Sequence, residues 1–260
     1  MADAQSTIKR LARTASSRTD LWTSFIVAQG CETVAEIGVY RGQFAERLLS
    51  DCPAVSRFYM IDPWRHLDEW NKPANRSDAV FERFFAETLD RTSGFADKRV
   101  ILRGKTTEVV DEIPDESLDL AYVDGDHTLR GISVDLISIF PKVKVGGFIA
   151  GDDFCRSIWQ HQEKFEPTLV FPFAVYFAEA VGARIYALPY RQMLIEKSSS
   201  ADFAFIDLTD SYDELGLRAQ LLEGSSRRAA RPAARRSSDD HSTPTSVIAR
   251  LRTALSSRRR

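Results

Sequence analysis

The chain has 260 residues, of which 43% are hydrophobic and 28% are charged. This composition is typical of a globular protein with one principal domain. We find no apolar run of the roughly 18 to 20 residues that a membrane-spanning helix needs, and no pattern of a secretion leader. The three cysteines have neither the spacing of a zinc site nor the even number of a disulfide framework. We therefore expect a cytoplasmic protein.

The net charge of -2 is unevenly distributed along the chain. Residues 225–260 contain ten arginines against two aspartates, an excess of +8, so the remainder carries -10. A mildly acidic body argues against nucleic acid as the substrate, because phosphate-binding proteins usually present a basic face. The arginine-rich tail would either attach to an anionic membrane, nucleic acid or partner, or act as a solvated extension. Its interspersed Ser and Asp residues favour the solvated extension.

The first predicted elements are helical. Residues 8–29 predict one or two helices, with an apolar stripe from Leu21 to Ile26 and with Gly30 as the terminator. From residue 34 onward, short apolar runs alternate with helical patterns, which is typical of βαβ units and a parallel sheet. The predicted strands are 34–37, 58–61, 100–102, 118–123 and 147–150, and the predicted helices between them include residues 44–49, 80–89 and 129–139.

Two further strand-like runs, 184–188 and 192–196, are separated only by the three residues 189–191. Three residues cannot hold a crossover helix, so these strands should form an antiparallel hairpin. After Leu222 the composition lacks the apolar content needed to offset ordering entropy, and we expect disorder over 224–246. Residues 247–255 could form a short basic helix. We divide the chain into an N-terminal helical extension (1–30), the principal domain (31–197), a partly ordered C-terminal extension (198–223) and a basic, disordered tail (224–260).

A glycine-containing segment, residues 36–42, lies between the first predicted strand and the next helix. Gly38 and Gly42 would let the backbone turn and approach a ligand at the strand ends of a doubly wound fold. Their spacing departs from G-x-G-x-x-G, so a dinucleotide fits poorly. Asp62 ends the second strand, where a carboxylate can accept hydrogen bonds from two ribose hydroxyls. Together these features indicate an adenosine-containing ligand without pyrophosphate, whereas either alone is equally compatible with an ordinary turn.

Acidic residues follow the fourth and fifth predicted strands. Asp124, Asp126 and His127 come after the fourth strand, and Asp152 and Asp153 come after the fifth. Adjacent parallel strands would bring these carboxylates to one edge, where they repel one another unless a cation or protons neutralise them. Oxygen ligands favour Mg²⁺, or Mn²⁺ or Ca²⁺. The alternative, solvated turn residues, suits Asp126 best.

Four segments together resemble a known family: E-I-G-V-Y-R-G (36–42), I-D-P-W (61–64), Y-V-D-G-D-H (122–127) and G-G-F-I-A-G-D-D-F (146–154). They resemble the bacterial methyltransferases that include macrolide-sugar O-methyltransferases of the macrocin type. They are more distantly similar to the catechol-type, metal-dependent O-methyltransferases. The resemblance covers about residues 30–197 and implies a class I methyltransferase dependent on S-adenosylmethionine. It also implies a Rossmann-like, doubly wound α/β sheet of seven strands, mostly parallel, ending in the antiparallel hairpin.

The resemblance also implies roles for residues in the donor site. Glu36, Gly38 and Gly42 would line the methionine part of S-adenosylmethionine, and Asp62 would hold the ribose. Trp64, two residues after Asp62, joins these cofactor-binding candidates.

By the same resemblance, Asp124, Asp152 and Asp153 would bind Mg²⁺ or Mn²⁺. His127 would be the general base that removes a proton from a metal-bound hydroxyl, although a lone histidine is more often structural. Asp152 stands where some relatives carry Glu, a difference that would shift the geometry of the metal site. The implied reaction is methyl transfer to a hydroxyl oxygen.

Two segments with aromatic residues, 63–75 and 159–177, would either form lids that suit a sugar ring or pack on the fold. We expect a small hydroxyl acceptor, a saccharide or glycosylated metabolite, as partner, no nucleic acid, and a chain that can form a homo-oligomer. Two alternatives have other chemistry: a nicotinamide-dependent oxidoreductase on a related sheet, and a non-catalytic carbohydrate- or metal-binding protein that retains the fold.

Overall fold

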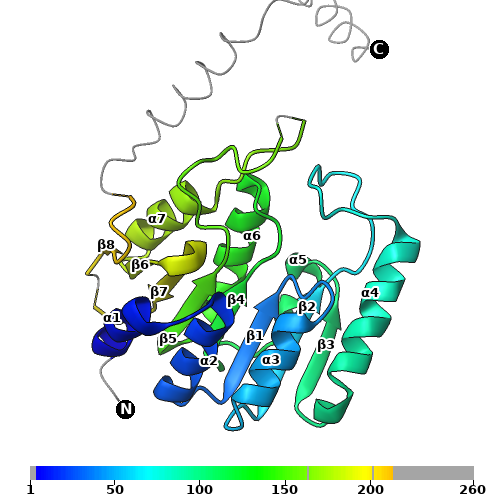
Figure 1. Cartoon of the computed structure of the whole chain (residues 1–260), viewed down its shortest axis with the longest axis horizontal. Coiled ribbons are helices and arrows are strands. Elements are labelled where there is room, and N and C mark those ends of the chain that lie inside the picture. Colours follow the sequence, from blue (N-terminus) through cyan, green and yellow to red (C-terminus); the bar gives the residue numbers. More distant parts are fainter. Residues whose placement is uncertain (1–3, 163, 201, 213–260) are drawn as a thin grey trace, which may run out of the picture. The chain divides into compact units, whose positions relative to one another are not determined.

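The computed structural model of the chain describes residues 4–162, 164–200 and 202–212 (Figure 1). The chain divides into two compact units, residues 1–222 and 223–260, and every described residue belongs to the first. The predictions of a disordered tail and of a helix at 247–255 therefore lie outside the described residues, as does the extension beyond residue 212. Within the described part, every helix is too short or too polar to traverse a lipid bilayer.

One sheet of eight strands organises the first unit, in the order β3-β2-β1-β4-β5-β7-β6-β8 (Figure 1). The strands are β1 (Thr33–Ile37), β2 (Arg57–Asp62), β3 (Arg99–Arg103), β4 (Leu118–Val123), β5 (Val143–Gly151), β6 (Arg184–Leu188), β7 (Gln192–Glu196) and β8 (Ala204–Asp207). β7 runs antiparallel to its neighbours β5 and β6, and the other pairs are parallel. The α/β class, the mostly parallel sheet and the C-terminal hairpin are confirmed.

The predicted number of seven strands is wrong, because the sheet has an eighth. β8 pairs in parallel with β6, with Ala204 opposite Arg184, at one edge of the sheet. It has only four residues, and all four are half-buried. A short segment without alternation between buried and exposed positions gives no strand signal in the sequence. Its pairing with β6, and not its own pattern, makes this segment a strand.

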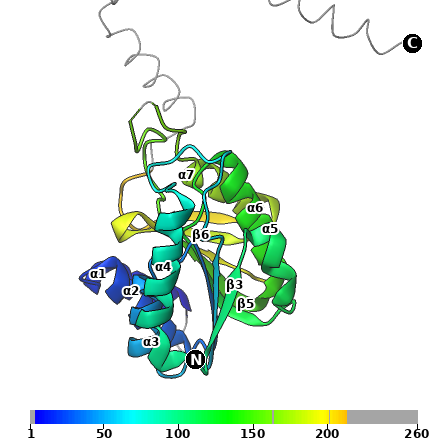
Figure 2. The ribbon, with the colours of Figure 1, turned by 90° about the vertical axis from the view of Figure 1, so that its right-hand side faces the viewer.

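Helices cover both faces of the sheet (Figure 2). The helices are α1 (Ala4–Thr14), α2 (Arg18–Gln29), α3 (Gln43–Asp51), α4 (Asp78–Arg91), α5 (Thr106–Val109), α6 (Leu129–Ile139) and α7 (Val170–Ala180). Helices α1 to α4 pack on one face and α5 to α7 on the other, so the unit has two apolar cores. Successive side chains of a strand point to opposite faces of the sheet, so each strand contributes to both cores. On β1, Val34 lies in the core beneath α1 to α4 and Ala35 in the core beneath α5 to α7.

The segment 8–29 forms two helices, a choice that the sequence leaves open. The Ser17 side chain accepts a hydrogen bond from the Asp20 N–H at the start of α2. The Asp20 carboxylate in turn accepts hydrogen bonds from the backbone N–H and the hydroxyl of Ser16, at 2.7 and 2.9 Å. Gly30 ends α2 in the left-handed conformation, as predicted. These reciprocal bonds fix where α2 begins and in which direction it starts.

One part of the segment 159–177 packs on the fold, and the other part is a loop beside the site. Its C-terminal part belongs to α7, where Phe171 and Phe177 pack into the core. The described residues of 156–169 form no helix or strand and remain a loop. The sequence does not reveal α7, because Pro172 reads as a breaker, yet proline is tolerated in the first turn of a helix.

The carboxyl ends of β1 and β4 lie at the point where the strand order reverses. β1 pairs with β2 on one side and with β4 on the other, so the connections after β1 and β4 diverge from a common gap. In doubly wound sheets, ligands bind in this gap. The fold therefore places residues 38–42 and 124–127 beside each other.

A buried carboxyl joins α6 to α5 beneath this gap. Asp135 on α6 accepts a hydrogen bond of 2.6 Å from the Thr106 hydroxyl on α5. Burial raises the pKa of Asp135 to about 7, and its bond with Thr106 opposes this shift only in part. The folded protein therefore retains the Asp135 proton at pH values where the unfolded chain has released it.

We predict that Asp135→Asn reduces the pH dependence of stability. Between pH 4 and pH 7 the folded state binds more protons at this site than the unfolded state, so the free energy of unfolding of the wild type falls as pH rises. The amide cannot ionise, and the variant should gain about 2 kcal/mol relative to the wild type between pH 5 and pH 7. Urea unfolding across this range measures the difference. The exposed Asp90→Asn is the control, and parallel curves for wild type and Asp135→Asn would contradict the prediction.

Candidate functional site

Gly38 allows the end of β1 to touch the end of β4. Its φ is +90°, in the region that favours glycine, and a Cβ at this position would overlap the carbonyl oxygen of Asp124. The Asp124 N–H donates to the Ile37 carbonyl at 2.8 Å, which holds the two strand ends together. Glycine is thus required here by the close approach of the β4 end, whereas the approach to a ligand expected from the sequence stays a prediction.

Asp62 lies at the end of β2, beside the same turn. Its two carboxylate oxygens accept backbone N–H bonds from Tyr40, at 2.8 Å, and from Trp64, at 2.7 Å. Burial raises the pKa of Asp62 to about 6, although the backbone N–H bonds act to lower it. The carboxylate is therefore held in one orientation, and each of its oxygens retains a lone pair for a ligand hydroxyl.

The other three cofactor candidates have different surroundings. Trp64 is fully buried in the core, where its indole N–H donates to the Tyr40 carbonyl at 2.8 Å. Gly42 has a φ of +70° and stands at the start of α3. Glu36 is buried on the face of the sheet that α1 to α4 cover, and burial raises its pKa well above the usual value. Its Oε2 has no hydrogen-bond partner within the described chain. Trp64 therefore holds the loop through the Tyr40 carbonyl, and its predicted contact with the cofactor stays a prediction.

A cavity of about 570 Å³ lies at the carboxyl ends of β1, β2 and β4. Its walls include Gly38, Asp62, Asp124, His127 and Asp153. The cavity therefore brings some of the predicted cofactor, metal and base residues into a single space. The other predicted residues do not line it: Glu36, Gly42, Trp64 and Asp152. Its volume falls within the roughly 300 to 1,000 Å³ of small-molecule sites.

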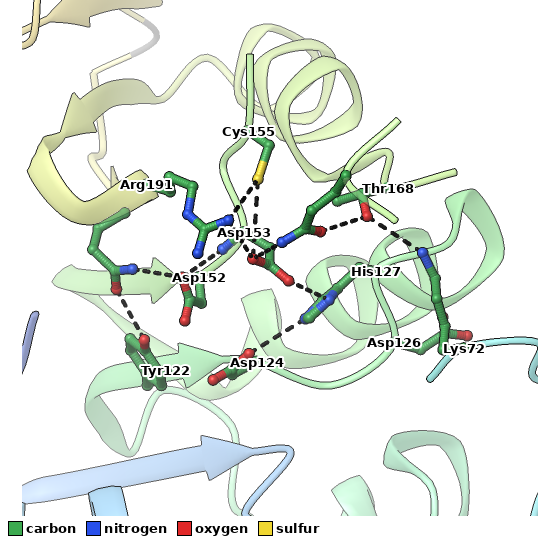
Figure 3. A network of polar contacts seen from close by, with 12 residues as sticks. Lys72, Tyr122, Asp124, Asp126, His127, Asp152, Asp153, Cys155, Thr168 and Arg191 are labelled. Carbon is green, nitrogen blue, oxygen red and sulfur yellow. Dashed lines mark hydrogen bonds and ion pairs between the residues drawn. The ribbon is translucent and has the colours of Figure 1, made fainter. Parts of the chain in front are cut away.

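His127 lies between two carboxylates (Figure 3). Its Nδ1 is 2.7 Å from Asp153 Oδ2, and its Nε2 is 3.3 Å from Asp124 Oδ1. Burial by itself would lower the pKa of His127, but the two carboxylates outweigh it and raise the pKa to about 10. Nε2 is buried without a well-aligned hydrogen bond within the described chain. The Asp153 contact thus fixes the ring and leaves Nε2 as the nitrogen available to a ligand.

Asp124 and Asp152 meet at a cation that the sequence did not predict. Arg18, the first residue of α2, places Nη1 at 3.3 Å from Asp124 Oδ2 and donates to Asp152 Oδ2 as well. Burial by itself would lower the pKa of the Arg18 guanidinium, but its interactions with Tyr122, Asp152 and Asp124 outweigh burial and raise the pKa. One arginine after two serines at the start of a helix gives no sequence signal for this contact.

Gln192 is a second residue that the sequence did not reveal. This side chain is fully buried at the start of β7, and its Nε2 donates to Asp152 Oδ1 at 2.7 Å. Its Oε1 accepts bonds from the Trp22 indole at 2.7 Å and from the Tyr122 hydroxyl at 2.9 Å. Gln192 therefore orients Asp152 and connects it to α2.

Lys72 ties together the two loops beside the cavity. Its buried ammonium donates to the carbonyls of Glu166 and Pro167, at 2.9 and 3.1 Å. It also donates to the Thr168 hydroxyl, at 3.3 Å (Figure 3). Burial lowers the pKa of Lys72. Residues 63–77 and 156–169, far apart in the sequence, are thereby fastened to each other.

The predicted metal ligands do not form a three-aspartate set. Asp153 is engaged with His127, and the oxygens of Asp124 and Asp152 that face each other both contact Arg18. Among the described residues, no three His, Cys, Asp or Glu side chains are arranged to hold an ion. Asp126 accepts a bond of 2.9 Å from the Thr128 N–H, as expected of a turn residue before α6.

The family model and the two solved structures to which this chain is similar are those of methyltransferases. Residues 35–154 match a family model described as a methyltransferase domain, and no curated protein sequence matches the chain. A Staphylococcus aureus structure provisionally named a caffeoyl-CoA O-methyltransferase has a TM-score of 0.51 at 14% identity, over 68% of this chain and 82% of that one. A Bacillus cereus O-methyltransferase in complex with SAH has a TM-score of 0.50 at 12% identity, over 75% and 90% of the two chains. At these identities both structures are evidence for the fold alone.

The domain match begins on β1, ends after the Asp152–Asp153 pair and so spans the motifs on which the resemblance rests. It favours methyl transfer over nicotinamide chemistry on a related sheet. Residues 35–154 are therefore similar to a methyltransferase domain, on a fold that the O-methyltransferase structures share.

Proposed function

We propose that this protein is an S-adenosylmethionine-dependent methyltransferase that acts on a hydroxyl oxygen of a small acceptor. The observation that carries the proposal is the single cavity that contains the glycine turn and Asp62 together with His127. A donor bound along Gly38 and Asp62 would direct its reactive end toward the histidine. The SAH bound in the Bacillus cereus structure supports the same type of donor here.

For the donor, we propose that Asp62 binds the ribose hydroxyls and that the turn at Gly38 lies against the methionine part. Glu36, on β1, and Gly42, at the start of α3, contribute by shaping the two ends of this turn. Trp64 contributes through its bond with the Tyr40 carbonyl, which holds residues 38–42 in place.

For the acceptor, we propose that its hydroxyl lies against His127 Nε2. The oxygen attacks the methyl carbon, the bond between carbon and sulfur breaks, and S-adenosylhomocysteine leaves with the electron pair. The hydroxyl proton passes to Nε2, while Asp153 stabilises the imidazolium. With a pKa of about 10, His127 is protonated in the protein alone, so its own proton must leave before this step.

The predicted binding of Mg²⁺ or Mn²⁺ by Asp124, Asp152 and Asp153 stays a prediction. Carboxylate oxygens suit either ion. The observed arrangement does not fit it, because Arg18 contacts two of the carboxylates and His127 the third. We therefore derive no step from a metal ion.

For the acceptor class, we propose a saccharide or a glycosylated metabolite. Trp70, from the loop 63–77, lines the cavity, and its buried indole N–H has no partner within the described chain. Arg130 and His161 add hydrogen-bonding groups to the same walls. An aromatic face beside several polar groups suits a sugar ring.

We further propose a helical extension over 1–30, a catalytic domain over 31–197 and further segments over 198–223 and 224–260. We also propose a cytoplasmic location and the capacity to form a homo-oligomer. Because α2 contributes Arg18 to the site, the helical extension is proposed as part of the functional enzyme.

We predict that the wild type binds S-adenosylmethionine saturably in calorimetry and that Gly38→Ala abolishes this binding. The added methyl group would collide with the Asp124 carbonyl and separate the strand ends. Gly94→Ala is the matched control, because a Cβ at Gly94 would meet nothing within 4 Å. Equal affinity of both variants would refute the donor site.

We predict that His127→Ala lowers turnover roughly 10²- to 10⁴-fold, because the variant loses the proton acceptor. Donor affinity should be retained, because within the described chain no hydrogen bond or ion pair joins the proposed donor residues Gly38 and Asp62 to His127. The assay is mass spectrometry of a saccharide-containing cell extract incubated with enzyme and methyl-labelled donor. The control is His66→Ala, which changes an exposed loop histidine. Unaltered turnover of His127→Ala would rule out the base role, and a wild type that labels nothing would favour a binding protein without catalysis.

A further inference from the structure

The Arg18 guanidinium occupies the space between two predicted metal ligands. Its Nη1 contacts Oδ2 of both Asp124 and Asp152. Mg²⁺ binds carboxylate oxygens at about 2.0 to 2.1 Å, so an ion that bridges these oxygens needs the place of Nη1. We propose that Arg18 is the resident cation of this carboxylate pair, in the role that the sequence assigns to a divalent ion.

The charges of the surrounding groups support this assignment. The three carboxylates of Asp124, Asp152 and Asp153 face the guanidinium of Arg18 and the imidazole of His127. Arg191 adds a third positive group, with Nη1 4.0 Å from Asp153 Oδ1 and 3.9 Å from the Cys155 sulfur. The permanently charged guanidinium groups of Arg18 and Arg191 thus lie on the oxygens of all three carboxylates, in the positions that an added cation would take.

Arg18 is held in position from several sides. Its guanidinium lies 5.4 Å from the centre of the Phe44 ring, in a cation–π contact. Just before α2, the Ala15 carbonyl accepts a bond of 2.7 Å from the Tyr190 hydroxyl, which anchors the helix start to the hairpin turn. One turn along α2, Trp22 is bonded to Gln192, the side chain that orients Asp152. The same helix therefore reaches Asp152 directly through Arg18 and indirectly through Trp22.

The proposal, which rests on the proposed function, makes Arg18 a positioning residue. By binding Oδ2 of Asp124, the guanidinium keeps Oδ1 of the same carboxylate near His127 Nε2. The N-terminal extension thus completes the site that the domain of residues 35–154 begins.

The test is a titration of the full-length protein with Mn²⁺ alone, followed by electron paramagnetic resonance of the free ion. We expect no stoichiometric binding to the wild type. Binding should be at least about tenfold tighter in Arg18→Ala, because the Oδ2 atoms of Asp124 and Asp152 then lose the guanidinium that they share. Mn²⁺ should raise the melting temperature of Arg18→Ala but not that of the wild type. The double variant Arg18→Ala/Asp152→Asn should lose the gained affinity. Arg13→Ala, at an exposed arginine of α1, is the matched control.

Stoichiometric Mn²⁺ binding by the wild type, or equal binding by wild type and Arg18→Ala, would overturn the proposal. The wild-type titration needs no variant, so the proposal stays testable if Arg18→Ala does not fold. Arg18→Lys, which keeps the charge, should exclude Mn²⁺ like the wild type. Calorimetry with S-adenosylhomocysteine separates the two ideas: a wild type that does not bind it contradicts the proposed function, whereas the Mn²⁺ result bears only on Arg18.

Discussion

The close approach of β1 and β4 at Gly38 is the constraint on which the site depends. Without a side chain at Gly38, the Ile37 carbonyl can accept the Asp124 N–H, and the two strand ends remain in register. The donor turn on one side and the Asp124 to His127 segment on the other then border the same cavity. A single backbone contact thus brings the proposed methyl donor and the proposed base within one space.

A second constraint is electrostatic. Carboxylates after β4 and β5 must lie at the same edge of a parallel sheet, and their mutual repulsion has to be offset. The structure offsets it with side chains of the chain itself: Arg18 binds Asp124 and Asp152, and His127 binds Asp153. This internal pairing orients each carboxylate, and it leaves His127 Nε2 without a well-aligned partner within the described residues, beside the cavity of the proposed acceptor.

Residues far from the motifs complete the site. Gln192 connects Asp152 to Tyr122 and to Trp22 of α2, so the hairpin, the sheet and the N-terminal helices share one hydrogen-bond network. Lys72 joins the two loops beside the cavity and gives the proposed acceptor region a fixed frame. Within the first unit, segments outside residues 35–154 therefore contact the residues of the candidate site.

The sequence by itself determined the α/β class, seven of the strands, the hairpin and the two acidic clusters, because strand and helix periodicities and motif spacing are local properties of the chain. It could not determine β8, since a four-residue strand depends on its neighbour β6. Nor could it show that Trp64 turns into the core or that Arg18 meets Asp152, 134 residues away. Those outcomes depend on packing between distant segments, where burial and charge pairing decide which side chains meet, and only the tertiary structure contains that information.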